Sequence, residues 1–207
     1  MAESLEQAWE LNQKGRNNII IGGNLWLKMG RRNIINAIDL SSLGLDKIEE
    51  DEGGFRIGCM ATLHDIETHE GLNKEFQNLF KEAVRHIVGV QFRNCATIGG
   101  SIFPKLGFSD VLTAFLACDT QVILYKKGEV PLREFIYIPT DNDILTHLYV
   151  KKDGRKTAYE SFRMTETDFP TITCAMAKTQ DGFETVLGAR PKHAEVVVDE
   201  VVADAFS

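Results

Sequence analysis

The chain has 207 residues, of which 43% are hydrophobic and 26% are charged, a composition typical of a globular protein. Its net charge of −7 argues against a nucleic-acid partner, because phosphate contacts need clustered lysine and arginine. No apolar run approaches the length that spans a bilayer, and the first residues lack the features of a signal peptide. We therefore expect a cytoplasmic protein with no membrane partner, folded as one large domain or two to three small ones.

The first 52 residues are expected to form a small βαβ-like unit. Ser4, followed three residues later by Gln7, is typical of a helix start, and Gly15 is expected to end that helix. The later elements follow in order: a short strand over 18–21, a helix start over 25–29, a second strand over 34–40 and a solvated acidic turn over 49–52.

A pair of glycines follows the first strand directly, in the sequence Gly22-Gly23-Asn24. A strand, a tight turn and a helix start together form an arrangement in which free N–H groups and the helix dipole favour an anion. A plain connecting turn explains the same residues, and both interpretations stay open for this turn alone.

The next segment is expected to contain a strand over 55–60 and a helix start capped by Thr62 with Asp65. The clearest helix is predicted over 72–88, because apolar residues recur there at helical spacing: Phe76, Leu79, Phe80, Ala83, Val84 and Ile87. His64 and His69 are five residues apart, which puts the two rings off a common helix face and argues against a metal site.

A second glycine pair lies at the centre of residues 89–110, in Thr97-Ile98-Gly99-Gly100-Ser101. The spacing fits neither a Walker loop nor a Rossmann fingerprint. Backbone N–H groups in such a loop can converge on one anion, although two glycines also occur in ordinary tight turns. Two such turns in one small chain could hold the two phosphates of a dinucleotide between them.

Residues 109–207 are expected to form one helix and then mostly strands. Ser109 can cap a helix from Asp110 to Ala117, a hairpin is predicted across Lys127-Gly128, and a strand is predicted from Asp143 to Val150. Further strands are expected over 158–162 and 171–177, a hairpin turn at 180–182, and a final helix or strand over 196–205. Cys59, Cys95, Cys118 and Cys174 lack the clustered spacing of a metal site, so we expect mostly buried thiols.

The residues around both turns resemble the FAD-binding medium subunit of the molybdenum hydroxylases, the xanthine dehydrogenase and carbon monoxide dehydrogenase family. The first turn is similar to that family's Ala-Gly-Gly-Thr/Gln pattern, with Ile21 where alanine is usual. The second is similar to its Gln-x-Arg-Asn-x-Ala-Thr-Ile-Gly-Gly-Asn/Ser pattern, from Gln91 to Ser101. The family's Ser-Asp pair follows as Ser109-Asp110, and the resemblance extends from about residue 4 to about residue 195.

The resemblance implies an α+β fold with a two-part FAD-binding domain, residues 1–52 and 53–150, and a shortened C-terminal α+β domain, residues 151–207. That last domain keeps the family's Asp168-Phe169-Pro170. The usual basic pair before it is replaced by Met164-Thr165, and its closing helices are missing, which weakens the expectation of nicotinamide docking and of contacts with neighbouring subunits.

The resemblance also implies that FAD lies between the first two parts, with its phosphates against the glycine turns. Ile87 would touch the flavin, Asp110 would help to hold FAD, and the backbone at Ile144 and Leu145 would run beside the isoalloxazine ring. The full set of implied cofactor-binding residues is Ile20, Ile21, Gly22, Gly23, Asn24, Leu25, Ile87, Ala96, Thr97, Gly99, Gly100, Ser101, Ser109, Asp110, Ile144 and Leu145.

The function implied by the resemblance is that of a flavoprotein electron-transfer subunit. A large molybdopterin-binding subunit would oxidise a substrate, a small 2Fe-2S subunit would relay the electrons, and the FAD of this chain would pass them to NAD or another acceptor. No side-chain constellation predicts a catalytic acid, base or metal ligand. Two alternatives stay open: an assembly subunit that has lost flavin, and a flavoprotein oxidase of a related fold, for which neither His64 nor His69 has a convincing context as a covalent attachment site.

Overall fold

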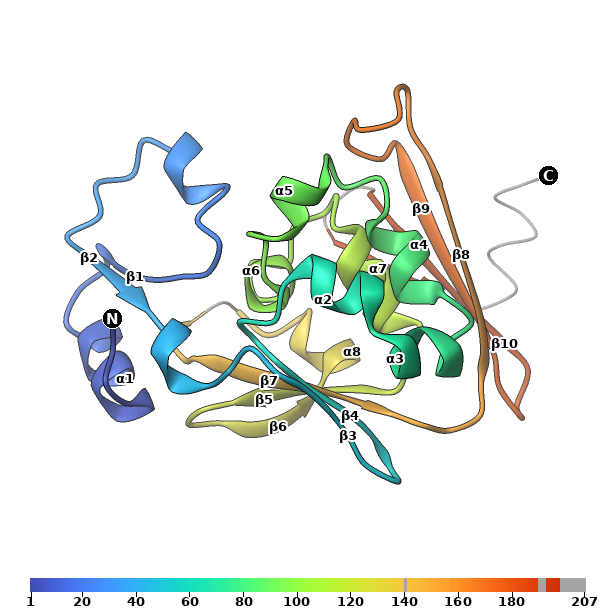
Figure 1. Ribbon diagram of the computed structural model, residues 1–207, viewed down its shortest axis with the longest axis horizontal. Helices are drawn as coiled ribbons and strands as arrows, with labels where there is room; N and C mark the ends of the chain where they lie inside the picture. The colour runs from blue at the N-terminus through green and yellow to red at the C-terminus, as the bar shows by residue number, and fades with distance from the viewer. Residues whose placement is uncertain (140, 190–192, 198–207) are drawn as a thin grey trace.

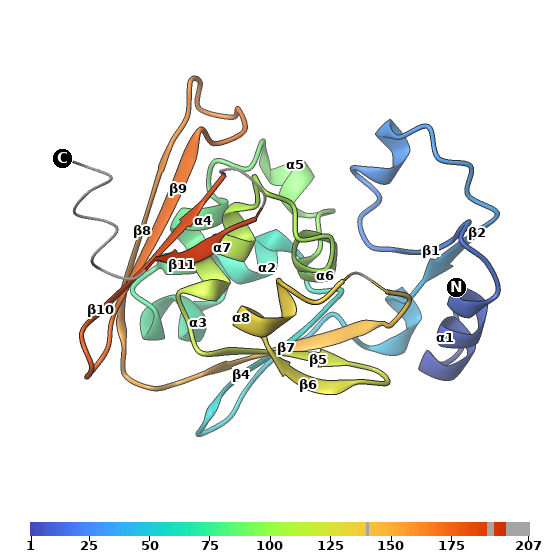
Figure 2. The ribbon, with the colours of Figure 1, turned by 180° about the vertical axis from the view of Figure 1, so that it is seen from behind.

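The computed structural model describes residues 1–139, 141–189 and 193–197 and contains three β-sheets with helices packed among them (Figure 1). A two-stranded sheet and one helix lie at one end, a five-stranded sheet crosses the middle, and a four-stranded sheet stands at the other end (Figures 1 and 2). This arrangement confirms the expected α+β fold. Within the described ranges, no helix combines the length and the apolar character needed to cross a membrane.

The N-terminal unit consists of helix α1 (Leu5–Gln13) and two parallel strands, β1 (Asn18–Ile21) and β2 (Asn36–Asp39). As predicted, the Ser4 side chain caps α1 by accepting the N–H of Gln7 at 3.1 Å. The helix start expected over 25–29 is confirmed only in part, because the segment between the strands forms a 3-10 turn, η1 (Leu27–Met29), and no α-helix. That turn ends at Gly30, whose backbone is extended and cannot continue a helix.

The five-stranded sheet is antiparallel and has the strand order β3-β4-β7-β5-β6. Its strands are β3 (Ile48–Glu50), β4 (Gly54–Gly58), β5 (Thr120–Leu124), β6 (Gly128–Pro131) and β7 (Leu145–Lys151). The hairpin predicted across Lys127-Gly128 joins β5 to β6. The acidic run 49–52 is only partly the turn we expected, because Glu49 and Glu50 pair with β4 and the chain turns after them.

Short helices cover one face of this sheet. They are α2 (Leu63–Thr68), α3 (Glu70–Glu75), α4 (Leu79–Val84), α5 (Val90–Arg93), α6 (Ile98–Ile102), α7 (Asp110–Leu116) and α8 (Leu132–Phe135), while the 3-10 turn η2 (Ser41–Leu43) follows β2 between the N-terminal unit and the sheet (Figure 1). The predicted caps are confirmed for α2, where Thr62 and Asp65 cap each other's backbone, and for α7, where Ser109 accepts the N–H of Leu112.

The single helix predicted over 72–88 is wrong, because the chain breaks between α3 and α4. Gln77 and Asn78 have positive φ values of 45° and 63°, which end the helix. The break is held by a strand far along the chain: the Gln77 side chain accepts the N–H of Thr157 at 2.7 Å, and the Thr157 hydroxyl donates to the carbonyl of Phe76 at 2.6 Å. The apolar residues of the pattern are nevertheless mostly buried, as predicted.

The four-stranded sheet has the order β11-β10-β9-β8 and packs on α7. Its strands are β8 (Lys156–Phe162), β9 (Ile172–Lys178), β10 (Phe183–Gly188) and β11 (Glu195–Val197), with the predicted hairpin turn between β9 and β10. Every residue of α7 is buried, and its Thr113 hydroxyl lies 2.9 Å from that of Thr173. The last predicted element forms a strand at Val196 and Val197, and its remaining residues lie outside the described ones.

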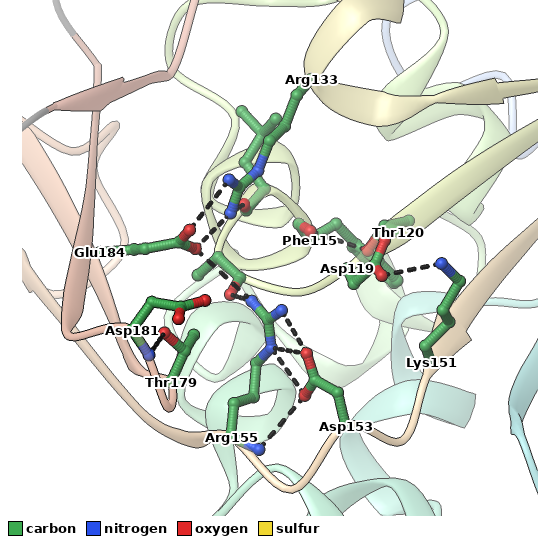
Figure 3. Close-up of polar contacts among 12 residues, drawn as sticks. Phe115, Asp119, Thr120, Arg133, Lys151, Asp153, Arg155, Thr179, Asp181 and Glu184 are labelled. Atoms are coloured by element: carbon green, nitrogen blue, oxygen red, sulfur yellow. Dashed lines mark hydrogen bonds and ion pairs between the residues drawn. The ribbon is translucent and has the colours of Figure 1, made fainter.

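An ion-pair network ties the four-stranded sheet to the C-terminal end of α7 (Figure 3). Arg133 of α8 and Arg155 of the β7–β8 turn both approach the carboxylate of Glu184. Arg155 is buried, binds Asp153 and donates to the carbonyl of Ala117, while Arg133 donates to the carbonyl of Leu116. Cations at the end of a helix match its dipole, so this network holds α7 and the sheet in one orientation.

Candidate functional site

The two glycine turns predicted from the sequence touch each other. An added Cβ at Gly22 would overlap the hydroxyl of Thr97, and one at Gly23 would overlap the carbonyl of Cys95 and lie 3.0 Å from the backbone nitrogen of Ala96. Glycine is therefore required in the first turn because the backbone of the second turn occupies the place of a side chain. The two turns are too close at Gly23 and Cys95 for a phosphate to fit between them. A ligand that contacts both turns must therefore lie beside the point where they touch.

The first turn offers unpaired backbone donors. Within the described part of the chain, no acceptor receives the N–H groups of Gly22, Gly23 and Asn24. Asn24 has a φ of 57°, a left-handed conformation that asparagine tolerates better than most residues. Successive N–H groups in such a turn form a concave anion site, so these residues fit a phosphate group.

The second turn uses its amides within the fold. The N–H of Ile98 donates to Ala61, that of Gly99 to Cys59, both at the carbonyl oxygen, and that of Gly100 to the Thr97 hydroxyl at 3.2 Å. The second turn therefore packs against the first and holds it in place, while the N–H groups that are free to bind a ligand come from the first turn.

The predicted hydroxyl residues hold α6 against α7. The Ser101 hydroxyl donates to the carbonyl of Thr97 at 3.0 Å, and the Ser109 hydroxyl donates to the carbonyl of Ser101 at 3.2 Å while accepting the N–H of Leu112. This chain of contacts joins Ser109 to the second glycine turn. It also gives each of these hydroxyl groups a structural role of its own.

Asp110 points into the protein interior. Its carboxylate accepts the hydroxyl of Tyr159 of β8 at 2.5 Å and pairs with the guanidinium of Arg163, the residue that follows β8. Burial raises the pKa of Asp110 above its ordinary value, even though Tyr159 and Arg163 act in the opposite direction. The structure thus gives Asp110 a role in docking β8 against the N-terminal end of α7.

The predicted contact segment at Ile144 and Leu145 is connected to the second turn through intervening backbone hydrogen bonds. Ile144 and Leu145 are buried, and the next residue, Thr146, accepts the N–H of Cys59, whose own carbonyl accepts the N–H of Gly99. Burial raises the pKa of the Cys59 thiol to about 12, so this linking residue is chemically inert near neutral pH. The remaining predicted residues Ile20, Ile21, Leu25, Ile87 and Ala96 are half-buried.

Arg93 belongs to the quoted motif but was not among the expected site residues, and the structure shows what it does. Its guanidinium binds Glu67 in a two-point contact of 2.8 and 3.0 Å and also donates to the carbonyls of Arg85 and Ile87, both at 3.3 Å. Burial would raise the pKa of Glu67, but hydrogen bonds and charge from Arg93 and His64 lower it. Arg93 thus fixes α5, and with it the approach to the second turn, against α2 and α4.

Replacing Arg93 by lysine is expected to lower the free energy of unfolding by about 2 kcal/mol. A single ammonium group cannot make the two-point hydrogen bond that the guanidinium makes to the partly buried carboxylate of Glu67. Urea denaturation measures the change. Arg85→Lys is the matched control, since the Arg85–Glu82 pair is about as short, at 2.8 Å, but exposed, and its loss should make little difference to stability. Equal losses in both variants would contradict a positioning role for Arg93.

An aromatic cluster next to the turns was not predicted. Trp26 stacks on Phe169 with ring centroids 5.4 Å apart and also contacts Phe92 at 6.4 Å and Phe108 at 5.6 Å. Phe108 and Phe169 are 4.5 Å apart. Three of these rings belong to the motif segments or lie next to them: Trp26 comes two residues after Asn24, Phe92 lies within the second motif, and Phe108 directly precedes Ser109.

Comparison with known proteins matches this arrangement to one family. A family model described as the FAD binding domain in molybdopterin dehydrogenase matches residues 1–150. An uncharacterized protein, YgfM, from Escherichia coli strain K12 is 26% identical over 189 residues, which are 89% of this chain and 71% of that protein. The glyceraldehyde dehydrogenase medium chain of Sulfolobus acidocaldarius is 26% identical over 197 residues, covering 88% of this chain and 70% of that one.

A solved structure is similar in fold over nearly the whole chain. Carbon monoxide dehydrogenase from Hydrogenophaga pseudoflava contains a chain that superimposes with a TM-score of 0.82 at 22% identity. The match covers 94% of the present chain and 75% of that chain. At this identity the likeness establishes the fold, and the family model carries the functional comparison.

Proposed function

Because the chain belongs to the family of FAD-binding domains of molybdopterin dehydrogenases, we propose that it is the electron-transfer flavoprotein subunit of a multi-subunit molybdenum hydroxylase. The observation that carries the proposal is the contact between the two glycine turns, beside the N–H groups of Gly22, Gly23 and Asn24, which have no acceptor among the described residues. A dinucleotide cofactor needs such donors for its pyrophosphate.

In this proposal FAD binds where residues 1–52 meet residues 53–150. The N–H groups of the first turn would hold the pyrophosphate, and the second turn would keep them in place through Thr97 and Cys95. The flavin supplies the ability to accept and release one or two electrons. The proposed contact residues remain Ile20, Ile21, Gly22, Gly23, Asn24, Leu25, Ile87, Ala96, Thr97, Gly99, Gly100, Ser101, Ser109, Asp110, Ile144 and Leu145.

We further propose xanthine dehydrogenase-like partners for this chain: a molybdopterin-binding large subunit that oxidises the substrate, and a 2Fe-2S small subunit that relays electrons. The chain would pass the electrons to NAD or another acceptor in the cytoplasm. The names of the similar proteins refer to different substrates, glyceraldehyde and carbon monoxide, so the proposal concerns a class of complex and no single substrate. Residues 151–207 would form the C-terminal domain of the subunit.

The experiment is a visible absorption spectrum after the purified chain is mixed with FAD and freed of excess by gel filtration. The wild type should retain flavin bands, and Gly100→Ala should bind FAD roughly tenfold more weakly. The added Cβ would meet only the Thr97 hydroxyl, at 3.1 Å, so that hydroxyl has to shift while the rest of the fold is kept. Gly15→Ala is the control, because nothing lies within 4 Å of its added Cβ.

The same sample tests the acceptor. After anaerobic reduction with dithionite, reoxidation of the retained flavin by NAD would support NAD as acceptor, and its absence would favour another one. A folded chain that retains no flavin under any of these conditions would contradict the proposal. It would favour the alternative of a non-enzymatic assembly subunit, which keeps the fold without the cofactor.

A further inference from the structure

The aromatic cluster of Trp26, Phe92, Phe108 and Phe169 joins the N-terminal unit to the rest of the molecule. Trp26 lies between the first glycine turn and η1, whereas Phe169 lies on the connection between β8 and β9 of the four-stranded sheet. In Figure 1 these two segments extend from opposite sides of the helical layer that carries α5. The Trp26–Phe169 stack therefore links two units that are distant in sequence and belong to different sheets.

This stack is exposed to solvent to an unusual degree for a pair of large rings. Trp26 is 43% exposed and Phe169 is 56% exposed. The two ring planes are inclined by 29°, an offset stack that aromatic pairs favour. A core contact would be covered on all sides, so the exposure indicates a closure at the surface that can open without unfolding the core.

Phe169 is anchored to the proposed site through the preceding residues. Arg163 donates to the carbonyl of Asp168 at 2.7 Å and, through another nitrogen, pairs with Asp110 at the start of α7. The N–H of Asp168 donates to the carbonyl of Thr165 at 3.2 Å and closes the turn. Through Arg163, Asp110 positions the loop that carries Phe169. The buried side chain of Asp110 therefore influences the contact between Phe169 and Trp26.

We propose that the Trp26–Phe169 contact holds the N-terminal unit closed beside the glycine turns and thereby sets how long FAD stays bound. The inference rests on the proposed function, because it concerns the same site. Trp26 stands two residues after Asn24, so a displacement of Trp26 carries the first turn and its N–H groups with it. Breaking the stack opens the unit more often, and each opening frees the pyrophosphate.

The test is the rate of FAD release, followed as the recovery of flavin fluorescence after dilution. Phe169→Leu and Trp26→Leu should each release FAD roughly tenfold faster, and the double variant should be little faster than either one, because each single variant already breaks the Trp26–Phe169 stack. Phe183→Ala is the matched control: Phe183 is 53% exposed on the same sheet and contacts Lys178 instead of the cluster, so release should be unchanged.

A second readout needs no cofactor. In a Trp9→Phe background Trp26 is the sole tryptophan, and Phe169→Leu should shift its emission to longer wavelength as the indole becomes more exposed. Unchanged FAD release from Phe169→Leu, or effects of Trp26→Leu and Phe169→Leu that simply add, would overturn this inference and leave the proposed function standing. A wild-type chain that never binds FAD would overturn both.

Discussion

Replacing Gly23 by alanine is expected to reduce the affinity for FAD by at least roughly 100-fold, or about 2.7 kcal/mol. The added Cβ would overlap the backbone carbonyl of Cys95 and lie 3.0 Å from the nitrogen of Ala96. These are backbone atoms of a turn that Arg93 and α6 hold in place, so they cannot rotate away as a flexible side chain would. The first turn must move instead, and its N–H groups lose their alignment with a phosphate.

Equilibrium titration of the chain with FAD, followed by quenching of flavin fluorescence, measures this loss. Gly15→Ala is again the control and should bind FAD as the wild type does, since its added Cβ has open space around it. Circular dichroism should show that both variants keep the wild-type secondary structure. A folded Gly23→Ala chain with wild-type affinity would mean that FAD does not depend on the contact between the turns.

Replacing Arg163 by methionine is expected to lower the free energy of unfolding at neutral pH by roughly 3–5 kcal/mol, because it leaves a buried carboxylate without its cation. Asp110 is 4% exposed, and its remaining partner is the hydroxyl of Tyr159 at 2.5 Å. The double variant Asp110→Asn/Arg163→Met removes the charge as well and should regain much of the loss. Denaturation in urea compares the three proteins, and equal losses in the single and double variants would contradict this account.

The loss in Arg163→Met should depend on pH in a defined direction. Burial already raises the pKa of Asp110 in the folded wild type, and removal of Arg163 takes away an interaction that opposes the rise. A carboxyl whose folded pKa exceeds its unfolded pKa stabilises the fold at low pH and loses that contribution as the pH rises through the folded pKa. The deficit of Arg163→Met relative to wild type should therefore be smaller at pH 5 than at pH 7.5.

The elements that could be predicted from the sequence have local causes. Ser4, Thr62 and Ser109 each cap a helix with a side chain three residues from its partner, and the turn at Lys127-Gly128 places glycine at a φ of 74°. The predicted helix over 72–88 failed because its break depends on Thr157, which is about 80 residues away and donates to the Phe76 carbonyl and to the Gln77 side chain at the end of α3. No local pattern reports a contact of that kind.

In the candidate site too, the features with a local sequence signal could be predicted and those that depend on distant contacts could not. The glycine turns were visible because strand, glycine pair and motif spacing are all local, whereas their mutual contact through Thr97 and Cys95 is a property of the fold. The aromatic cluster was missed because its four rings come from four separate segments without a shared period. The role of Arg93 could have been inferred from its place in the motif, but its partner Glu67 lies 26 residues earlier and carries no signal.

An NMR spectrum of the chain labelled with ¹⁵N only at glycine, recorded as FAD is added, tests whether the glycine turns hold the pyrophosphate. We expect the amide signals of Gly22 and Gly23 to shift most and those of Gly99 and Gly100 to shift less, because the latter N–H groups are already bonded within the fold, whereas Gly15 and Gly128 should stay unchanged. Bound FAD that leaves the signals of Gly22 and Gly23 in place would contradict the claim that the paired turns hold its pyrophosphate.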